Sequence, residues 1–265
     1  MDFQLAHFYP DLMSLYGGWA NLAVVKRHLE DLGNRVTVLS LRPGDEADLS
    51  DLDFIYMGAG TERSAAAALA DFHRFGEGLR AAAEGDVPML FAGTAMSLIG
   101  KTVTDALGNT AEGIGLGDFS SRETSRRIVG DVYGATGLYN GPVVGFMNKC
   151  TLVSGVKTPL LTALSLGSGN QEKPGANDAG GESDADCKPD ADCESDADCE
   201  GFLRNHVIAS HLTGPILVKN PPLLNWVLGG IYARRGQTLP EGPAYPYEAE
   251  GYEITVRELK NRIPK

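Results

Sequence analysis

PMLFAGTAMSLIG, residues 88–100, joins an apolar run to a helical pattern through a single glycine, Gly93. Residues 88–92 predict a short buried strand, and the pattern becomes helical near Met96. A buried strand that leads directly into a helix is typical of βαβ units with a parallel sheet. This stretch therefore indicates an α/β fold with a sharp turn at the carboxyl end of a strand.

The residues before this stretch repeat the same alternation. Strand patterns lie at residues 3–9 (FQLAHFY), 35–41 (RVTVLSL) and 53–58 (DFIYMG), with helical patterns at residues 21–32 and 64–83. Right-handed crossovers between such units give a doubly wound, mostly parallel sheet whose crevice lies at the carboxyl ends of the strands. We therefore expect any site to be built from the loops that follow the strands, at Tyr9, Gly58 and Gly93.

The pattern changes after Gly100 to β-rich segments that are punctuated by glycine. Residues 127–133 and 143–156 predict an antiparallel, β-rich extension of the sheet, and residues 206–212 predict a last strand. A closing helix is predicted at residues 221–234, and its apolar positions form one inward face: Leu224, Val227, Leu228 and Ile231.

Residues 168–201 interrupt this domain with almost no apolar side chains and carry the hexads ESDADC, KPDADC and ESDADC at residues 182–199. Such a composition cannot bury enough apolar area to offset the entropy of ordering, so we expect disorder. Thiolates and carboxylates repeated in this way could bind a thiophilic metal, but no CxxC pair or histidine completes a known spacing, and a solvated insert is favoured. The chain is then one domain, residues 1–235, that carries this insert, followed by a tail at residues 236–265 that wraps the surface or is mobile.

The negative charge is concentrated in the same insert. The net charge is −12, of which residues 178–200 supply −9 and the rest of the chain −3. This balance argues against a nucleic-acid or anionic-membrane surface. The N-terminus has no basic region followed by an apolar one, and no apolar run is long enough to span a bilayer, so we expect a cytoplasmic protein without membrane insertion.

Neither a phosphate-binding glycine loop nor a disulfide framework is indicated. The sequence has no Walker-type loop, and GAGTER departs from a dinucleotide-binding motif at its last position. We therefore expect the chain to use no cofactor of its own, with any ATP bound by a partner. Three of the four cysteines lie in the insert, which does not suggest a secreted disulfide scaffold.

Five segments, in order, resemble GatD-type class I glutamine amidotransferases of the CobB/CobQ type: YPDLMSLYGGWANL (9–22), MGAGTER (57–63), EGIGLGDF (112–119), GFMN (145–148) and ASHLTGPILVKNP (209–221). The resemblance implies a flavodoxin-like fold with a nucleophilic cysteine at the turn after a strand and a histidine before Gly-Pro. It also implies a heterodimer with a MurT-like Mur ligase that amidates the D-glutamate of lipid II with ammonia from glutamine.

The two catalytic positions of that family are changed in this sequence. Gly93 stands at the cysteine position and Thr213 at the histidine position. Glycine has no group to deprotonate, and threonine cannot act as a general base at neutral pH. The sequence therefore predicts a catalytically inactive scaffold or regulatory subunit, with no intact catalytic residue.

The positions that flank the glutamine pocket in the family also depart from its pattern. The glycine loop reads Gly58-Ala59-Gly60-Thr61-Glu62, and a later segment reads Gly145-Phe146-Met147-Asn148-Lys149. By resemblance, Gly58, Gly60 and Arg127 are candidates for binding the substrate, with Arg127 on its carboxylate. A surface arginine beside Asp131 is an equally good interpretation of Arg127.

Two other functions stay open. One is an active hydrolase rebuilt around Thr94 or Ser97, with His211 as the base. Residues two apart on a strand face the same side, so His211 would lie on the same side as Thr213. The sequence lacks the G-x-S-x-G turn of such enzymes, and a partly buried strand histidine is the plainer interpretation of His211. Cys150 precedes no helix and is read as an inert thiol. The other function is a module that senses glutamine or another amino acid through Arg127.

Overall fold

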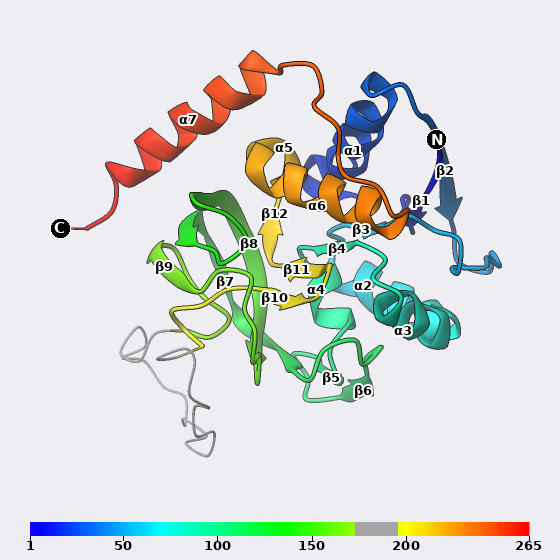
Figure 1. Ribbon diagram of the computed structural model, residues 1–265. Helices are drawn as coiled ribbons and strands as arrows, with labels where there is room; N and C mark the ends of the chain where they lie inside the picture. Colours follow the sequence, from blue (N-terminus) through cyan, green and yellow to red (C-terminus); the bar gives the residue numbers. More distant parts are fainter. Residues whose placement is uncertain (173–195, 265) are drawn as a thin grey trace.

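The computed structural model describes residues 1–172 and 196–264 and contains two six-stranded sheets flanked by helices (Figure 1). The strands of the main sheet run in the order β10-β11-β4-β3-β1-β2, and every neighbouring pair is parallel except β10–β11. Their bounds are β1 Asp2–Phe8, β2 Arg35–Leu41, β3 Phe54–Met57, β4 Met89–Ala92, β10 Phe202–Arg204 and β11 Val207–Ser210. The order β2-β1-β3-β4 is that of flavodoxin-like sheets. The predicted doubly wound α/β fold is confirmed.

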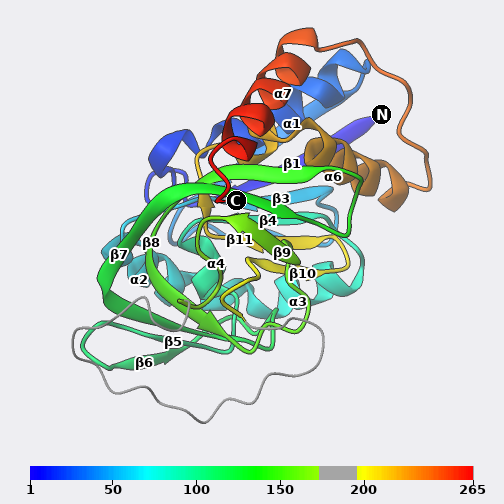
Figure 2. The ribbon, with the colours of Figure 1, turned by 90° about the vertical axis from the view of Figure 1, so that its left-hand side faces the viewer.

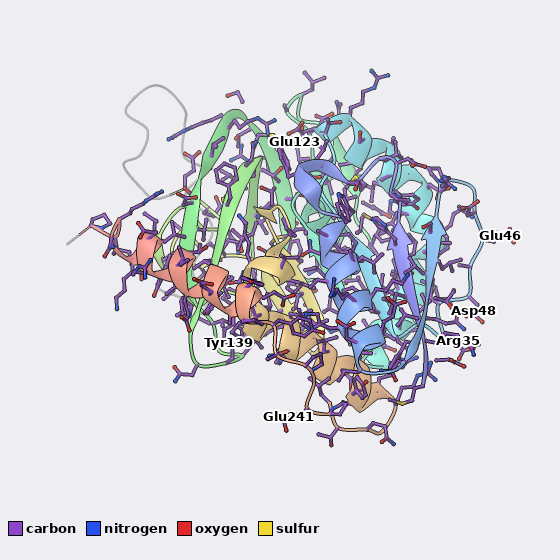
Figure 3. All side chains as sticks on the ribbon, turned by 90° about the horizontal axis from the view of Figure 1, so that it is seen from above. Arg35, Glu46, Asp48, Glu123, Tyr139 and Glu241 are labelled. Carbon is purple, nitrogen blue, oxygen red and sulfur yellow. The ribbon has the colours of Figure 1, made fainter. Side chains whose placement is uncertain are left out.

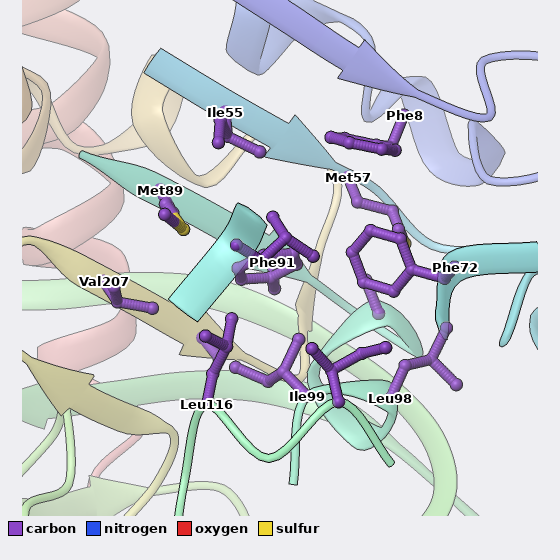
Figure 4. Packing of buried hydrophobic residues seen from close by; sticks show 14 of the residues in the cluster. Phe8, Ile55, Met57, Phe72, Met89, Phe91, Leu98, Ile99, Leu116 and Val207 are labelled. Carbon is purple, nitrogen blue, oxygen red and sulfur yellow. The ribbon is translucent and has the colours of Figure 1, made fainter. Parts of the chain in front are cut away.

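Helices cover both faces of the main sheet (Figure 1). In β3, Phe54 and Tyr56 pack into one apolar cluster, whereas Ile55 and Met57 pack into the other, because successive side chains of a strand alternate. The first cluster lies under α1 (Ala20–Asp31) and α6 (Pro221–Arg234). The second lies under α2 (Glu62–Phe72) and α3 (Gly76–Glu84), and Figure 4 shows its aromatic centre: Phe8, Phe72 and Phe91.

The β-rich half builds a second sheet instead of adding strands to the first. Its order is β12-β8-β7-β5-β6, with β9 paired to β7, and the long hairpin of β7 and β8 forms its centre (Figure 2). Their bounds are β5 Thr102–Thr104, β6 Thr110–Glu112, β7 Ser120–Ala135, β8 Pro142–Ser154, β9 Ala163–Leu166 and β12 Leu212–Thr213. Residues 127–133 and 143–156 form antiparallel strands, as predicted, and they pair with each other as parts of β7 and β8. The predicted last strand at residues 206–212 is split, because β11 pairs with β4 and β12 pairs with β8.

One helical prediction needs adjustment, and another holds at both ends. The segment at residues 64–83 contains α2, a 3₁₀ turn at His73–Phe75 and α3, and this break lets Phe72 and Phe75 both reach the core. The closing helix α6 has the predicted bounds, and its four predicted inward residues are buried. Two short helices, α4 (Ala95–Leu98) and α5 (Ile216–Lys219), follow β4 and β12. A 3₁₀ turn at Leu15–Gly17 precedes α1.

The tail contains a helix that the sequence analysis did not predict. Helix α7 (Pro246–Lys260) lies beside β7 and β8, where Tyr252 Oη donates a hydrogen bond to the carbonyl oxygen of Pro142 at 2.7 Å. His28 of α1 lies 3.1 Å from the carboxylate of Glu248. Figure 1 shows α7 as the red helix that ends near the C-terminus. In the described part of the chain, no helix is long and apolar enough to span a membrane.

The ends of the predicted disordered insert are ordered. Asn170 accepts a hydrogen bond from the N–H of Gly201 at 2.9 Å and donates one to the Gly201 carbonyl at 3.0 Å. Asn170 and Glu200 are fully buried. The predicted disorder of residues 168–201 is therefore wrong at both ends, because each end finds buried polar partners. Residues 173–195, which hold most of the hexads and the suggested metal ligands, lie outside the described residues.

Candidate functional site

A small cavity lies at the carboxyl ends of β1, β3 and β4, where the sequence analysis expected a site. Its volume is about 150 Å³. The loops after the three strands contribute most of its wall, and the second sheet closes it. The lining residues are Leu15, Tyr16, Ala59, Gly60, Thr61, Glu62, Thr94, Arg127, Asn148 and Thr213. Gly60 and Arg127, two of the predicted substrate-binding residues, thus lie in one cavity wall, whereas Gly58 lies just before it.

Gly93 has the geometry of a nucleophile turn but no room for a side chain. Its φ is +64°, the left-handed region that glycine tolerates best, and its N–H donates to the carbonyl of Ser210 at 2.7 Å. A Cβ at this position would lie 2.5 Å from Cβ of Ala59 and 3.4 Å from Cγ2 of Thr213. The methyl group of Ala59 therefore occupies the space that a nucleophilic side chain would need.

Thr213 lies beside Gly93, as the two predicted catalytic positions would require. It belongs to β12 and is 3% exposed. Its Oγ1 donates a hydrogen bond to the carbonyl oxygen of Phe146 at 3.1 Å, while its Cγ2 lies 3.4 Å from the place that a Cβ at Gly93 would occupy. Apolar methyl groups thus face each other where the family motif places a thiol and an imidazole.

Thr94 is held by backbone groups and is not poised as a nucleophile. Its Oγ1 accepts a hydrogen bond from the N–H of Gly60 at 2.8 Å and donates one to the Gly60 carbonyl at 3.1 Å. The hydroxyl proton is therefore bound to a carbonyl oxygen, which is not a general base. This clamp joins the loop after β3 to the start of α4.

His211 does not line the cavity. It lies between β11 and β12, is 1% exposed, and has Nδ1 at 3.4 Å from Oε1 of Glu200. Burial and the neighbouring Lys149 charge lower the pKa of His211 to about 4. The prediction that it shares a strand face with Thr213 is wrong, because the strand breaks at this residue and its two halves join different sheets.

Arg127 is bound by groups of the protein itself. Its Nη2 donates to Oε1 of Glu62 at 2.7 Å, and its Nη1 donates to Oδ1 of Asn148 at 3.1 Å. Burial raises the pKa of Glu62, but hydrogen bonds from Cys150, from its own backbone and from Arg127 bring it below the usual value. Arg127 is not paired with Asp131, which instead accepts a hydrogen bond from Arg262 at 2.7 Å.

Cys150 faces the same carboxylate. Its Sγ donates a hydrogen bond to Oε1 of Glu62 at 2.9 Å. Burial and this carboxylate raise the pKa of the thiol to about 12. Since the thiolate is the reactive form, these surroundings disfavour Cys150 as a nucleophile.

The sequence placed Glu62 and Asn148 beside the pocket but did not predict the hydrogen bonds that hold the cavity wall together. Tyr16 accepts a hydrogen bond from Nδ2 of Asn148 at 3.0 Å, and Glu62 joins Arg127 to Cys150. The signal for Glu62 was its place at the end of the MGAGTE loop, at the start of a helix. Within residues 1–172 and 196–264, no group of three or more His, Cys, Asp or Glu side chains is arranged to hold a metal ion.

Comparisons with known proteins identify the family of this chain. A family model described as a CobB/CobQ-like glutamine amidotransferase domain matches residues 4–184. The chain is 23% identical over 239 residues to the lipid II isoglutaminyl synthase (glutamine-hydrolyzing) subunit GatD of Staphylococcus aureus (strain N315), covering 89% of this chain and 86% of that protein. It is 26% identical over 245 residues to the subunit of the same name from Streptococcus pneumoniae (strain ATCC BAA-255 / R6), covering 91% and 85%.

The fold is also similar to that of a solved structure, a crystal structure of a glutamine amidotransferase. The TM-score is 0.51 at 13% identity, and the match covers 85% of this chain and 98% of the other. The matched family model spans more than half of the sequence and includes the turn at Gly93. This chain therefore belongs to the CobB/CobQ-like class I glutamine amidotransferase family, as a GatD-like member.

Proposed function

We propose that this chain is a GatD-like subunit that does not hydrolyse glutamine, and that it serves a MurT-like, ATP-dependent ligase as a structural or regulatory partner in the amidation of lipid II. The observation that carries the proposal is the packing of Ala59 against Gly93. A methyl group 2.5 Å from the site of a Cβ leaves no place for a thiol. The change therefore involves the surrounding packing as well as the catalytic residue.

The remaining polar groups supply no substitute for the missing chemistry. Thioester formation from glutamine needs a nucleophile with an acid or base partner and donors for the oxyanion. The hydroxyls of Thr94 and Thr213 both donate to backbone carbonyls, and Cys150 keeps its proton. A ligase that depends on this subunit would use free ammonia as its nitrogen donor.

An exposed apolar group near the cavity supports a partner. Leu15, Tyr16 and Trp19 are 38%, 46% and 58% exposed, and the first two line the cavity. Large aromatic side chains contribute strongly at the centres of protein interfaces. We propose that this group contacts the Mur-ligase-like subunit and that contact covers the mouth of the cavity.

A glutaminase assay tests the inactive site. We would measure glutamate release from glutamine by the native chain, by Gly93→Cys/Thr213→His, and by the same double variant with Ala59→Gly, each alone and with the co-expressed ligase. We expect release only when all three changes are combined, because Ala59→Gly frees the space for the thiol. Release by the native chain that is abolished by His211→Ala would refute the proposal and establish a rebuilt hydrolase.

Co-purification tests the partner surface. Trp19→Ala should weaken retention of the ligase about ten-fold or more, as expected for a buried interface aromatic. Tyr247→Ala is the matched control, because Tyr247 is 86% exposed but lies on α7, away from the cavity. Equal retention by both variants would place the interface elsewhere.

A second function is favoured by the charges in the cavity. Arg127 and Glu62 line it together, and this pair matches the carboxylate and ammonium groups of an α-amino acid. Such a ligand would have to replace the bond between the two residues. Isothermal titration with glutamine decides the matter: heat that is lost in Arg127→Gln supports an amino-acid sensor, whereas no heat leaves the scaffold role alone.

A further inference from the structure

A second cavity lies next to the one at Gly93, and nothing in the proposed function uses it. Its volume is about 280 Å³, and it is enclosed by α2, α4, the β5–β6 hairpin and the start of β7. Glu62 and Thr94 line both cavities and form the wall between them. The volume of the larger cavity is close to the lower limit for small-molecule sites, and its lining is mixed as in such sites.

The long walls of this cavity are apolar. Ala65 and Leu69 of α2 face Leu98 of α4 and Val103 of β5. Ala70, which is exposed, lies at the side of α2 that lines the cavity. Because Ala65 and Ala70 of α2 have short side chains, the cavity stays open between α2 and α4. An aliphatic chain can therefore lie there without displacing a side chain.

Carboxylates predominate among the charged groups of the lining. They belong to Glu62, Asp105 and Glu123, and the lining also holds the imidazole of His73 but neither lysine nor arginine. Glu62 is paired with Arg127, and Asp105 accepts hydrogen bonds within its own turn, including one from Asn109 Nδ2 at 2.9 Å.

Glu123 is the carboxylate that lacks a counter-ion. In the described residues it accepts a bond from the Ala106 N–H at 3.3 Å and forms no ion pair. Burial, and then the charges of Glu62 and Asp105, raise its pKa above the usual value. Figure 3 labels Glu123 where the green strands come close to the cyan helices. A half-buried carboxylate in such surroundings favours a bound cation.

A buried hydroxyl in the same lining also lacks a partner. Ser97 of α4 is 5% exposed, and its Oγ has no hydrogen-bond partner among the described residues. It lies in the wall of the cavity. Because an unsatisfied buried hydroxyl is costly, this group points to a ligand that completes its hydrogen bonding.

We propose that this cavity binds a small aliphatic amine in its ammonium form, with a second polar group on its chain. The ammonium group pairs with Glu123, the chain lies against the apolar side of α2 and α4, and the second polar group bonds to Ser97. The proposal does not depend on the inactive state of the Gly93 turn, because the two cavities are separate and the amine is neither consumed nor made.

Titration with 6-aminohexan-1-ol tests this site, followed by calorimetry or by chemical-shift changes of the native protein. We expect saturable binding that is at least about ten-fold weaker for 6-hydroxyhexanoate, which has the same chain but the opposite charge. Glu123→Gln should weaken amine binding by a similar factor, and Ser97→Ala by a smaller one.

A pair of variants on one helix shows whether this cavity is the place of binding. Ala70→Phe fills its edge and should abolish binding, whereas Ala67→Phe is equally exposed on α2 but does not line the cavity and should leave binding intact. Thermal unfolding of both variants verifies that they fold. The proposal is overturned by an absence of saturable binding, by equal binding of the carboxylate, or by equal effects of the two phenylalanine variants.

Discussion

Replacing Gly93 by alanine should destabilise the protein strongly, and the structure separates two causes. The backbone at this residue has φ +64°, a conformation that costs an L-residue about 1–2 kcal/mol. The new Cβ would also lie 2.5 Å from Cβ and 3.3 Å from Cα of Ala59. Overpacking of a buried site adds about 1–3 kcal/mol. We therefore expect the free energy of unfolding to fall by about 2–5 kcal/mol in Gly93→Ala.

A second substitution isolates the steric part. Ala59→Gly alone should cost about 1 kcal/mol, because it removes a buried methyl group. If Ala59 is the obstacle, the double variant Ala59→Gly/Gly93→Ala should be more stable than additivity predicts, by about 1–3 kcal/mol. Urea unfolding of the native protein, both single variants and the double variant gives this coupling energy directly.

Gly115→Ala provides the matched control for the backbone term. Gly115 has φ +73°, and a Cβ there would have no heavy atom within 4 Å. This variant should therefore show only the cost of the left-handed conformation, about 1–2 kcal/mol. Additive losses at Ala59 and Gly93, or equal losses in Gly93→Ala and Gly115→Ala, would refute the claim that Ala59 fills the place of a nucleophile.

Three further predictions test other parts of the site and the fold. The pKa of His211 is lowered from 6.5 to about 4 by burial, so the unfolded chain binds the proton first as pH falls. This residue should therefore remove about 2 kcal/mol of stability between about pH 7.5 and pH 5, and His211→Gln should lose that dependence in urea titrations. Thr94→Val should lower stability by about 1–2 kcal/mol and Thr94→Ser by much less, because only the serine keeps the hydroxyl clamp; equal losses would contradict it. Arg235→Ala should cost about 1–3 kcal/mol, because it removes the bidentate partner of fully buried Asp53 and leaves it the N–H of Gln4. Arg27→Ala at an exposed pair should cost less than about 0.5 kcal/mol, and urea unfolding of both variants measures the difference.

The main sheet could be predicted because its signals are local. Strand β2 and helix α6 have the predicted bounds, residues 35–41 and 221–234, because each is bounded by residues that end a regular element. Gly33 follows α1 with φ +80°, as a glycine at the end of a helix often does. These features depend on neighbours in the sequence and need no knowledge of distant contacts.

The second sheet and the tail could not be predicted in this way. The strand at residues 206–212 looked continuous, yet its halves pair with strands that lie far away in the sequence. Glu200 belongs to an acidic segment whose composition predicts disorder, but Ser210 Oγ donates to its carboxylate at 2.7 Å and the N–H of His211 does so at the same distance. A composition describes the average residue of a segment and cannot identify the one carboxylate that has buried partners.

The candidate site was predicted in position but not in its packing. The order of the motifs was enough to expect Gly93 and Thr213 side by side, and their predicted roles as vacated positions stay a prediction. That Ala59 fills the space between them depends on a contact across two loops, for which the sequence holds no periodic signal. The role proposed for His211 relied on an unbroken strand, and the strand is broken there.

The hydrogen bonds between Asn170 and Gly201 join the two described ends of the acidic segment. Because these residues hydrogen-bond to each other, the chain departs and returns at one fixed point whatever lies between them. Lengthening a loop whose ends are already joined costs little, since the closure entropy grows only with the logarithm of its length. We therefore expect that repeat units gained or lost between Asn170 and Gly201 leave both sheets intact, and that a fluorescent domain or an affinity tag inserted there has little cost to folding.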